Sequence, residues 1–267
     1  MPIMKLSGPK PVLMVVLSLV FESAFGNKFM YQHAIKAPDE MRQQHKQFVS
    51  EGDFGVYLTP CITVPHEWFG DLKNKRLLGL ASGGGQQMPV FSKLGAICTV
   101  FDYSDRQLEA ERTISEREGY SIQIIKGDMT KTLPFEDESF DIIFHPVSNC
   151  YVEDVYHIWN ECYRVLKKGG RLLAGFDNGI DFLFEGDNPL LVVNKLPFNP
   201  LKMPNERFEA MAKNGEGIQF SHSLEEQIGG QLKAGFTLKD LYEDRDRVGG
   251  AKIRDYLPQY MATLAVK

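Results

Sequence analysis

The sequence predicts an α/β protein built on a doubly wound, mostly parallel sheet. Three observations support this prediction. Short apolar segments typical of buried strands alternate with segments of helical periodicity along most of the chain. Three consecutive glycines, residues 83–85, separate an apolar strand from a helix, and the next strand ends on an acid, Asp102, 17 residues after Gly85. A strand, a glycine turn, a helix and a second strand form half of a nucleotide-binding unit.

The glycine turn follows a strand over residues 76–80 and precedes a helix over about residues 87–94, and the second strand spans residues 97–101. Glycines at such a turn let a ligand approach the backbone, and the helix N-terminus offers N–H groups to a polar or anionic group. An acid at the tip of the second strand accepts hydrogen bonds from both hydroxyls of a ribose. We therefore expect an adenosine-containing ligand, with Asp102 on its ribose.

The chain has 267 residues, 43% of them hydrophobic and 24% charged, which suffices for one full α/β domain with additions. Its net charge is −5 and it has no run of lysines or arginines, so we expect no nucleic-acid partner. The cysteines lack metal-ligand spacing, so we expect reduced thiols and no metal. These are Cys61, Cys98, Cys150 and Cys162.

Residues 1–26 form an apolar segment whose role stays open. Lys5 and Lys10 precede an apolar run over residues 12–21, and small residues follow at Ala24 and Gly26, which is the outline of a secretory signal. The run is short for a bilayer span. A packed helix or strand, or a start codon placed too early, is favoured over export.

Residues 27–71 form an N-terminal cap segment, helical over about residues 27–50 and irregular and aromatic over residues 53–71. Its aromatic side chains include Phe54, Tyr57, Trp68 and Phe69. They either shield a ligand from water or cover the bottom of the sheet. The main domain is expected over residues 72–267.

The glycine spacing separates two ligand classes. A dinucleotide fingerprint requires a small residue three positions after Gly85, where this chain has Met88. The stretch LLGLASGGG instead resembles the first motif of class I S-adenosylmethionine-dependent methyltransferases, hhDhGxGxG. Leu80, Gly83 and Gly85 match that motif.

Two positions depart from the motif. Gly79 stands where the family usually has an acid, so the resemblance implies that other groups hold the methionine end of the cofactor. Ala81 replaces a usual glycine, a change of little consequence. Gln86 and Gln87, at the helix start, either donate to the cofactor carboxylate or face solvent.

The segment after Asp102 predicts a helix and a third strand. Ser104 and Gln107 form a capping box that opens a helix reaching about Glu118, and Gly119 ends it. Residues 121–126 then form the strand.

Gly127-Asp128-Met129 stands at the tip of the third strand. In the resembling family, an acid followed by an apolar residue at this tip binds adenine, which implies that role for Asp128 and Met129. The alternative is that Asp128 only caps a turn.

The fourth strand, residues 140–144, leads into a loop at the carboxyl edge of the sheet, where ligands of open α/β sheets bind. The loop carries His145, Ser148, Asn149 and Cys150. His145 is the best candidate for a proton acceptor or a substrate-orienting group, because neutral imidazole takes up a proton near pH 7. A buried structural histidine is the alternative.

The second half predicts a helix over residues 153–167 ended by Gly169 and Gly170, then a fifth strand over residues 171–176. Residues 177–222 are an insertion rich in Asn, Pro and Phe, which commonly builds the acceptor pocket or its lid in the resembling enzymes.

A capping box, Ser223 with Glu226, opens a helix over residues 223–232, and Gly229 with Gly230 predicts a close backbone approach or a break. His222 precedes this helix and is a second candidate for the acceptor site, or a surface histidine. Residues 236–243 and 259–266 form a late antiparallel hairpin.

The resemblance, spanning residues 50–267, implies a Rossmann-like seven-stranded sheet and transfer of a methyl group from S-adenosylmethionine to a small-molecule acceptor in the cytoplasm, without membrane association. His145 is the expected catalytic residue. The expected cofactor contacts are Ala81, Gly83, Gly85, Gln86, Asp102, Tyr103, Asp128, Met129 and His145. An oxidoreductase is disfavoured by Met88 and the hairpin, and a non-catalytic cofactor-binding protein draws support from Gly79.

Overall fold

The computed structural model describes residues 54–184, 191–213, 218–247, 249–250 and 252–267. The two N-terminal predictions, for residues 1–26 and for a helical segment over about residues 27–50, lie outside the described residues. Within the described part, no helix combines the length and the apolar character that crossing a bilayer requires.

Seven strands form one mixed sheet in the order β3-β2-β1-β4-β5-β7-β6. They are β1 (Arg76–Leu80), β2 (Ile97–Asp102), β3 (Ile122–Lys126), β4 (Phe140–His145), β5 (Leu166–Asp177), β6 (Thr237–Asp244) and β7 (Tyr260–Val266). The first five strands are parallel, and β7 runs antiparallel to both β5 and β6. The expected seven-stranded sheet with a late antiparallel hairpin is confirmed.

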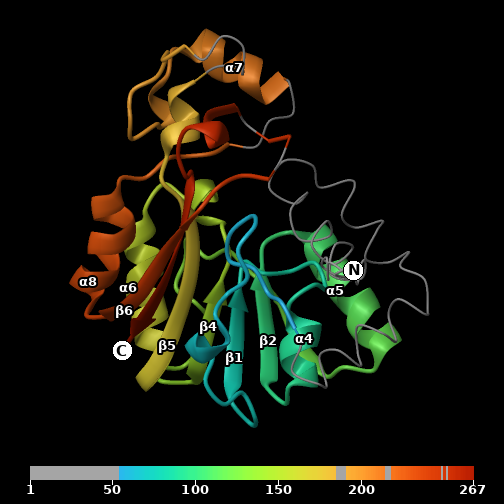
Figure 1. Cartoon of the computed structure of the whole chain (residues 1–267). Helices are drawn as coiled ribbons and strands as arrows, with labels where there is room; N and C mark the ends of the chain where they lie inside the picture. The colour runs from blue at the N-terminus through green and yellow to red at the C-terminus, as the bar shows by residue number, and fades with distance from the viewer. Residues whose placement is uncertain (1–53, 185–190, 214–217, 248, 251) are drawn as a thin grey trace, which may run out of the picture.

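Helices cover both faces of the sheet, and the chain continues through α4 (Met88–Lys93), α5 (Asp105–Glu118), α6 (Val155–Val165), α7 (Asn205–Lys213) and α8 (Gly230–Ala234) (Figure 1). Alternate residues of a strand point to opposite faces. Leu77 packs with Phe91 of α4 and with the segment before β1, whereas Leu78 packs with Trp159 of α6. Burial on both faces explains why the parallel strands read as continuous apolar runs.

Two local predictions for α5 and two for the helical segment after Ser223 are confirmed. The Ser104 side chain accepts a hydrogen bond from Gln107 N, and Gly119 ends α5 in the left-handed conformation. Ser223 and Glu226 form the reciprocal bonds of a capping box. A Cβ on Gly230 would lie 2.5 Å from Cδ1 of Trp159, so the predicted close approach is real. The expected helix is divided into a π-helical turn, Glu225–Gly229, followed by α8.

The boundary between α6 and β5 differs from the prediction. The helix ends at Val165 and does not continue to Lys167, because Leu166 already pairs with Phe140 of β4. Gly169 and Gly170 lie within β5 and do not end the helix. Pairing across the sheet outweighs the local helical pattern here.

The segment before β1 has two separate roles. Trp68 and Phe69 are buried in the core, and Trp68 Nε1 donates to Asp240 Oδ2 at 3.0 Å. Tyr57 and Leu58 instead reach the carboxyl edge of the sheet, where Leu58 O accepts from Val147 N at 3.3 Å. The insertion after β5, which carries α7, lies above the carboxyl ends of the strands (Figure 1).

Candidate functional site

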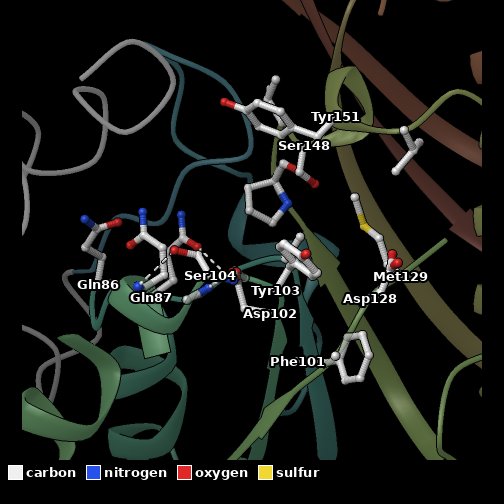
Figure 2. Close-up of a pocket in the computed structure, with 18 of the residues that line it drawn as sticks. Gln86, Gln87, Phe101, Asp102, Tyr103, Ser104, Asp128, Met129, Ser148 and Tyr151 are labelled. Carbon is white, nitrogen blue, oxygen red and sulfur yellow. Dashed lines mark hydrogen bonds between the residues drawn. The ribbon is translucent and has the colours of Figure 1, made fainter. Parts of the chain in front are cut away.

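A pocket of about 520 Å³ opens at the carboxyl edge of the sheet, a size typical of small-molecule sites. Its walls come from the segments that follow β1, β2, β3 and β4, and from Tyr57 and Leu58. Figure 2 shows Asp102 and Tyr103 at the centre, Gln86 and Gln87 to one side, and Asp128 and Met129 to the other.

Asp102 is the most firmly held acid of the pocket. Its Oδ2 accepts from Gly83 N at 3.0 Å and its Oδ1 accepts from Ser104 N at 2.9 Å. Burial raises the pKa of Asp102, and the backbone hydrogen bonds oppose that rise. The carboxylate faces the glycine turn and the pocket, as a ribose-binding acid requires.

Of the three glycines of the turn, only the first, Gly83, lines the pocket. Ala81 and Gly83 line the pocket, and Ala81 has a left-handed φ of 50°. Gly85 is not among the lining residues, because its N–H donates to the buried Glu111 Oε2 at 2.6 Å. A Cβ on Gly83 would lie 3.0 Å from Asp102 Oδ2, so a side chain there would disturb that acid.

The two glutamines at the start of α4 differ. Gln86 lines the pocket. Gln87 also borders it but is 6% exposed, and its Nε2 donates to Tyr57 O at 2.9 Å while its Oε1 accepts from Ser82 Oγ at 2.8 Å. Gln87 is thus neither a solvent-facing residue nor a free donor, and it ties the segment before β1 to the turn.

Gly79, one of the two departures from the motif, packs against Met88. A Cβ on Gly79 would lie 2.8 Å from Sδ of Met88, whose side chain is fully buried. The thioether therefore fills the space beside Gly79, and a carboxylate at position 79 would collide with it.

The far end of the pocket is formed by Asp128, Met129 and the 72% exposed Tyr103. Asp128 Oδ1 accepts from both Thr130 N at 2.9 Å and Thr130 Oγ1 at 2.7 Å. These bonds lower the pKa of Asp128 and keep it ionised. Asp128 does cap a turn, and the same acid borders the pocket.

The structure does not bring His145 to the pocket surface. The side chain is fully buried, Nδ1 lies 2.9 Å from Leu80 O, and Nε2 lies 2.8 Å from Asn149 Oδ1. Burial lowers the pKa of His145. The ring packs edge-on against Trp159. The alternation of β4 carries the signal for this, since Ile143, two residues earlier, also faces α6.

His222 is 3% exposed, and its Nε2 lies within 3.1 Å of the Asn149 and Val152 carbonyl oxygens. His222 is therefore a buried residue that binds the backbone of the loop after β4, and it does not line the pocket. Of the loop residues singled out from sequence, only Ser148 lines the pocket.

The acceptor side of the pocket is mostly apolar. It is formed by Tyr57, Leu58, Pro146, Val147, Ser148, Tyr151 and Val152. Sequence reasoning missed Tyr151, because a half-exposed aromatic in an irregular loop leaves no periodic signal. Among the described lining residues, the charged side chains are two carboxylates, Asp102 and Asp128, without a lysine, arginine or histidine.

These groups fit an adenosyl cofactor: an oriented carboxylate for hydroxyls, an acid beside an apolar side chain for a purine, and a narrow glycine turn. The sheet order and the position of this pocket are typical of α/β proteins that bind a nucleotide-containing ligand at the carboxyl edge of the sheet.

Comparisons with known proteins agree with this class. The methyltransferase-domain family matches residues 78–174. The Bacillus subtilis protein "Uncharacterized methyltransferase YbaJ" is 42% identical over 232 residues, which span 85% of this chain and 90% of that protein. The chain belongs to the class I S-adenosylmethionine-dependent methyltransferases.

Solved structures share the fold. An S-adenosylmethionine-dependent methyltransferase from Mesorhizobium loti is 18% identical and aligns over 75% of this chain and 94% of its own, with a TM-score of 0.58. A protein from Listeria monocytogenes described as a putative enzyme of this kind aligns over the same shares with a TM-score of 0.57 and 18% identity.

Proposed function

We propose that the pocket binds S-adenosylmethionine along the carboxyl edge of β1, β2 and β3. Asp102 accepts from the ribose hydroxyls, Asp128 accepts from the adenine amine, and Met129 packs on the adenine ring. The observation that carries this proposal is the carboxylate of Asp102, which is held by Gly83 N and Ser104 N and borders the pocket.

We assign the methionine end of the cofactor to the part of the pocket beside the glycine turn. Ala81, Gly83 and Gln86 line the pocket there, and Tyr103 borders the adenosine portion. Gly85 contributes through the shape of the turn, because its N–H is already used within the protein. The bound cofactor supplies an electrophilic methyl group, and the chain positions the acceptor in line with it and excludes water.

We further propose an acceptor that is a small molecule without negative charge. The described lining offers no cation to pair with a carboxylate or phosphate, and its two acids would repel one. It also offers no histidine or lysine to remove a proton. The acceptor atom must therefore be a nucleophile in its own right, such as a neutral amine or an electron-rich carbon, on a partly apolar molecule that packs on Tyr57, Leu58 and Tyr151.

In this proposal His145 is a positioning residue. Its bond to Asn149 supports the loop that carries Ser148 and Tyr151. The imidazole holds the acceptor wall in place and takes no proton from the acceptor.

Calorimetric titration with S-adenosylhomocysteine tests the cofactor assignment. Asp102→Ala should bind it at least about tenfold more weakly, because bonds to a charged acceptor contribute about 1.5–3 kcal/mol. Asp105→Ala is the matched control, since Asp105 is an exposed neighbour paired with Lys126. A mutant at position 102 that binds as tightly as the parent would overturn the assignment.

The acceptor proposal is tested by separating a metabolite extract on an anion exchanger. Formation of S-adenosylhomocysteine should depend on the unbound fraction, which holds neutral and cationic molecules. Turnover supported only by the retained, anionic fraction would overturn the proposed acceptor class.

A further inference from the structure

One face of α5 forms the support of the glycine turn. Gln107, Glu111 and Ile114 are spaced four and three residues apart, so they lie along one side of the helix. A Cβ on Gly83 or Gly84 would meet Gln107 within 2.9 Å, and one on Gly85 would overlap the side chain of Ile114. The turn therefore needs glycine because it lies directly on this helix.

Glu111 is the polar member of that face. Its side chain is fully buried, and its Oε2 accepts from Gly85 N at 2.6 Å. The other oxygen, Oε1, is buried without a hydrogen-bond partner among the described residues. Burying a carboxyl group costs free energy of desolvation, so a carboxyl group buried in this way usually has a structural or functional role.

No other carboxylate is available to this part of the turn in the described structure. Position 79 is a glycine, and the buried thioether of Met88 fills the space beside it. Asp102 is engaged with Gly83 N and Ser104 N, at the opposite end of the turn.

We propose that Glu111 is a positioning residue for the cofactor site, whose carboxyl group holds Gly85 N and thereby fixes the turn that presents Gly83 and Asp102 to the cofactor. This inference rests on the proposed function of the pocket. Gly85 has φ of 74° and Gly84 φ of 119°, so the turn is held in conformations that other residues avoid. The hydrogen bond at Gly85 N limits the alternative conformations of the turn.

The charge state of Glu111 couples it to the pocket. Burial raises the pKa of Glu111 to about 8, with a smaller contribution from the charge of Asp102 and against the lowering effect of the hydrogen bond from Gly85 N. Cys98 is the other titratable group that faces it, and burial keeps that thiol neutral by raising its pKa to about 12. Near pH 7 the carboxyl group is mostly neutral, and ionisation above pH 8 adds a second negative charge beside Asp102.

Three variants separate this role from a merely structural one. Glu111→Gln keeps an oxygen for Gly85 N and cannot ionise. Glu111→Leu has a similar volume and leaves Gly85 N unpaired. Glu109→Gln is the matched control, because Glu109 lies on the exposed side of the same helix and pairs with Arg112.

Titrating each variant with S-adenosylhomocysteine at pH 7 should leave the Gln variant and the control within about twofold of the parent, and weaken the Leu variant about tenfold or more. In turnover, the Leu variant should raise the KM for the donor and leave kcat within about twofold. Without ligand, amide hydrogen exchange over residues 82–87 should be faster in the Leu variant and unchanged in the Gln variant.

The pH profile supplies a readout that does not need the Leu variant to fold. Between pH 7 and 9 the affinity of the parent should change differently from that of Glu111→Gln, because only the parent has a carboxyl group at this position that can ionise. Equal pH profiles for parent and Glu111→Gln, or a folded Leu variant with parental affinity, would overturn the proposal. Loss of the Asp102 effect described above would instead overturn the cofactor assignment itself, so the two failures are distinguishable.

Discussion

The carboxylate of Asp102 at the end of β2 accepts a hydrogen bond from the backbone N–H of Gly83 after β1, with 3.0 Å between Oδ2 and N. The two residues are 19 positions apart in sequence, and the bond joins the carboxyl ends of two neighbouring parallel strands. The bond orients the carboxylate of Asp102 toward the pocket. It also holds the glycine turn close to that carboxylate. The proposals for the cofactor site depend on this junction.

The adenine end of the pocket offers a test that separates binding from turn formation. In Asp128→Asn, the remaining oxygen can still accept from Thr130, but the amide nitrogen replaces a carboxylate oxygen. Affinity for S-adenosylhomocysteine should fall about tenfold, in line with the loss of a charge-assisted bond, while the melting temperature changes little. Thr130→Val is the control: it removes the hydroxyl bond and should leave the affinity close to that of the parent. Equal losses in both variants would mean that Asp128 acts only through its turn.

Gly85 should tolerate alanine less well than Gly119, although their φ angles, 74° and 73°, are nearly equal. Both variants place a Cβ in the left-handed region, which costs about 1–2 kcal/mol. Only Gly85→Ala also drives a methyl group into Ile114, whereas nothing lies within 4 Å of a Cβ at Gly119. Overpacking adds about 1–3 kcal/mol. Chemical denaturation should show the larger loss for Gly85→Ala, with partial recovery when Ile114→Ala is added. Equal losses would remove the argument that the turn lies tightly on α5.

We expect His145 to make the stability of the fold sensitive to acid, and we do not expect it to set the pH dependence of the reaction. Burial lowers its pKa below the usual 6.5, and the same holds for His222. Below about pH 6.5 the unfolded chain takes up protons that the folded chain does not. The free energy of unfolding therefore decreases as the pH is lowered. His145→Gln should lower stability by about 1–3 kcal/mol at pH 7 and flatten part of this slope.

The pH dependence of kcat near neutrality should be the same in His145→Gln as in the parent. A kinetic pKa that disappears with His145 would restore it as the proton acceptor.

Much of the architecture was readable from local sequence. The strand before the glycines, the cap at Ser104, the left-handed Gly119 and the position of Asp102 at a strand tip all agree with the structure. These features follow from backbone conformation and periodicity, which neighbouring residues decide. The family resemblance then supplied the late antiparallel hairpin, which β6 and β7 form.

Contacts between residues distant in sequence decided the rest. Gly85 N bonds to Glu111 26 residues further on, Gln87 bonds to Tyr57 30 residues earlier, and Leu166 leaves a helical pattern to pair with Phe140. A sequence names the polar groups but not their partners, because a buried donor or acceptor is satisfied by whatever the packed fold brings within 3 Å. The sequence by itself therefore determined the scaffold and the acid at its centre. Only the tertiary structure decided that His145 turns into the core and that a helix carboxyl group holds the glycine turn.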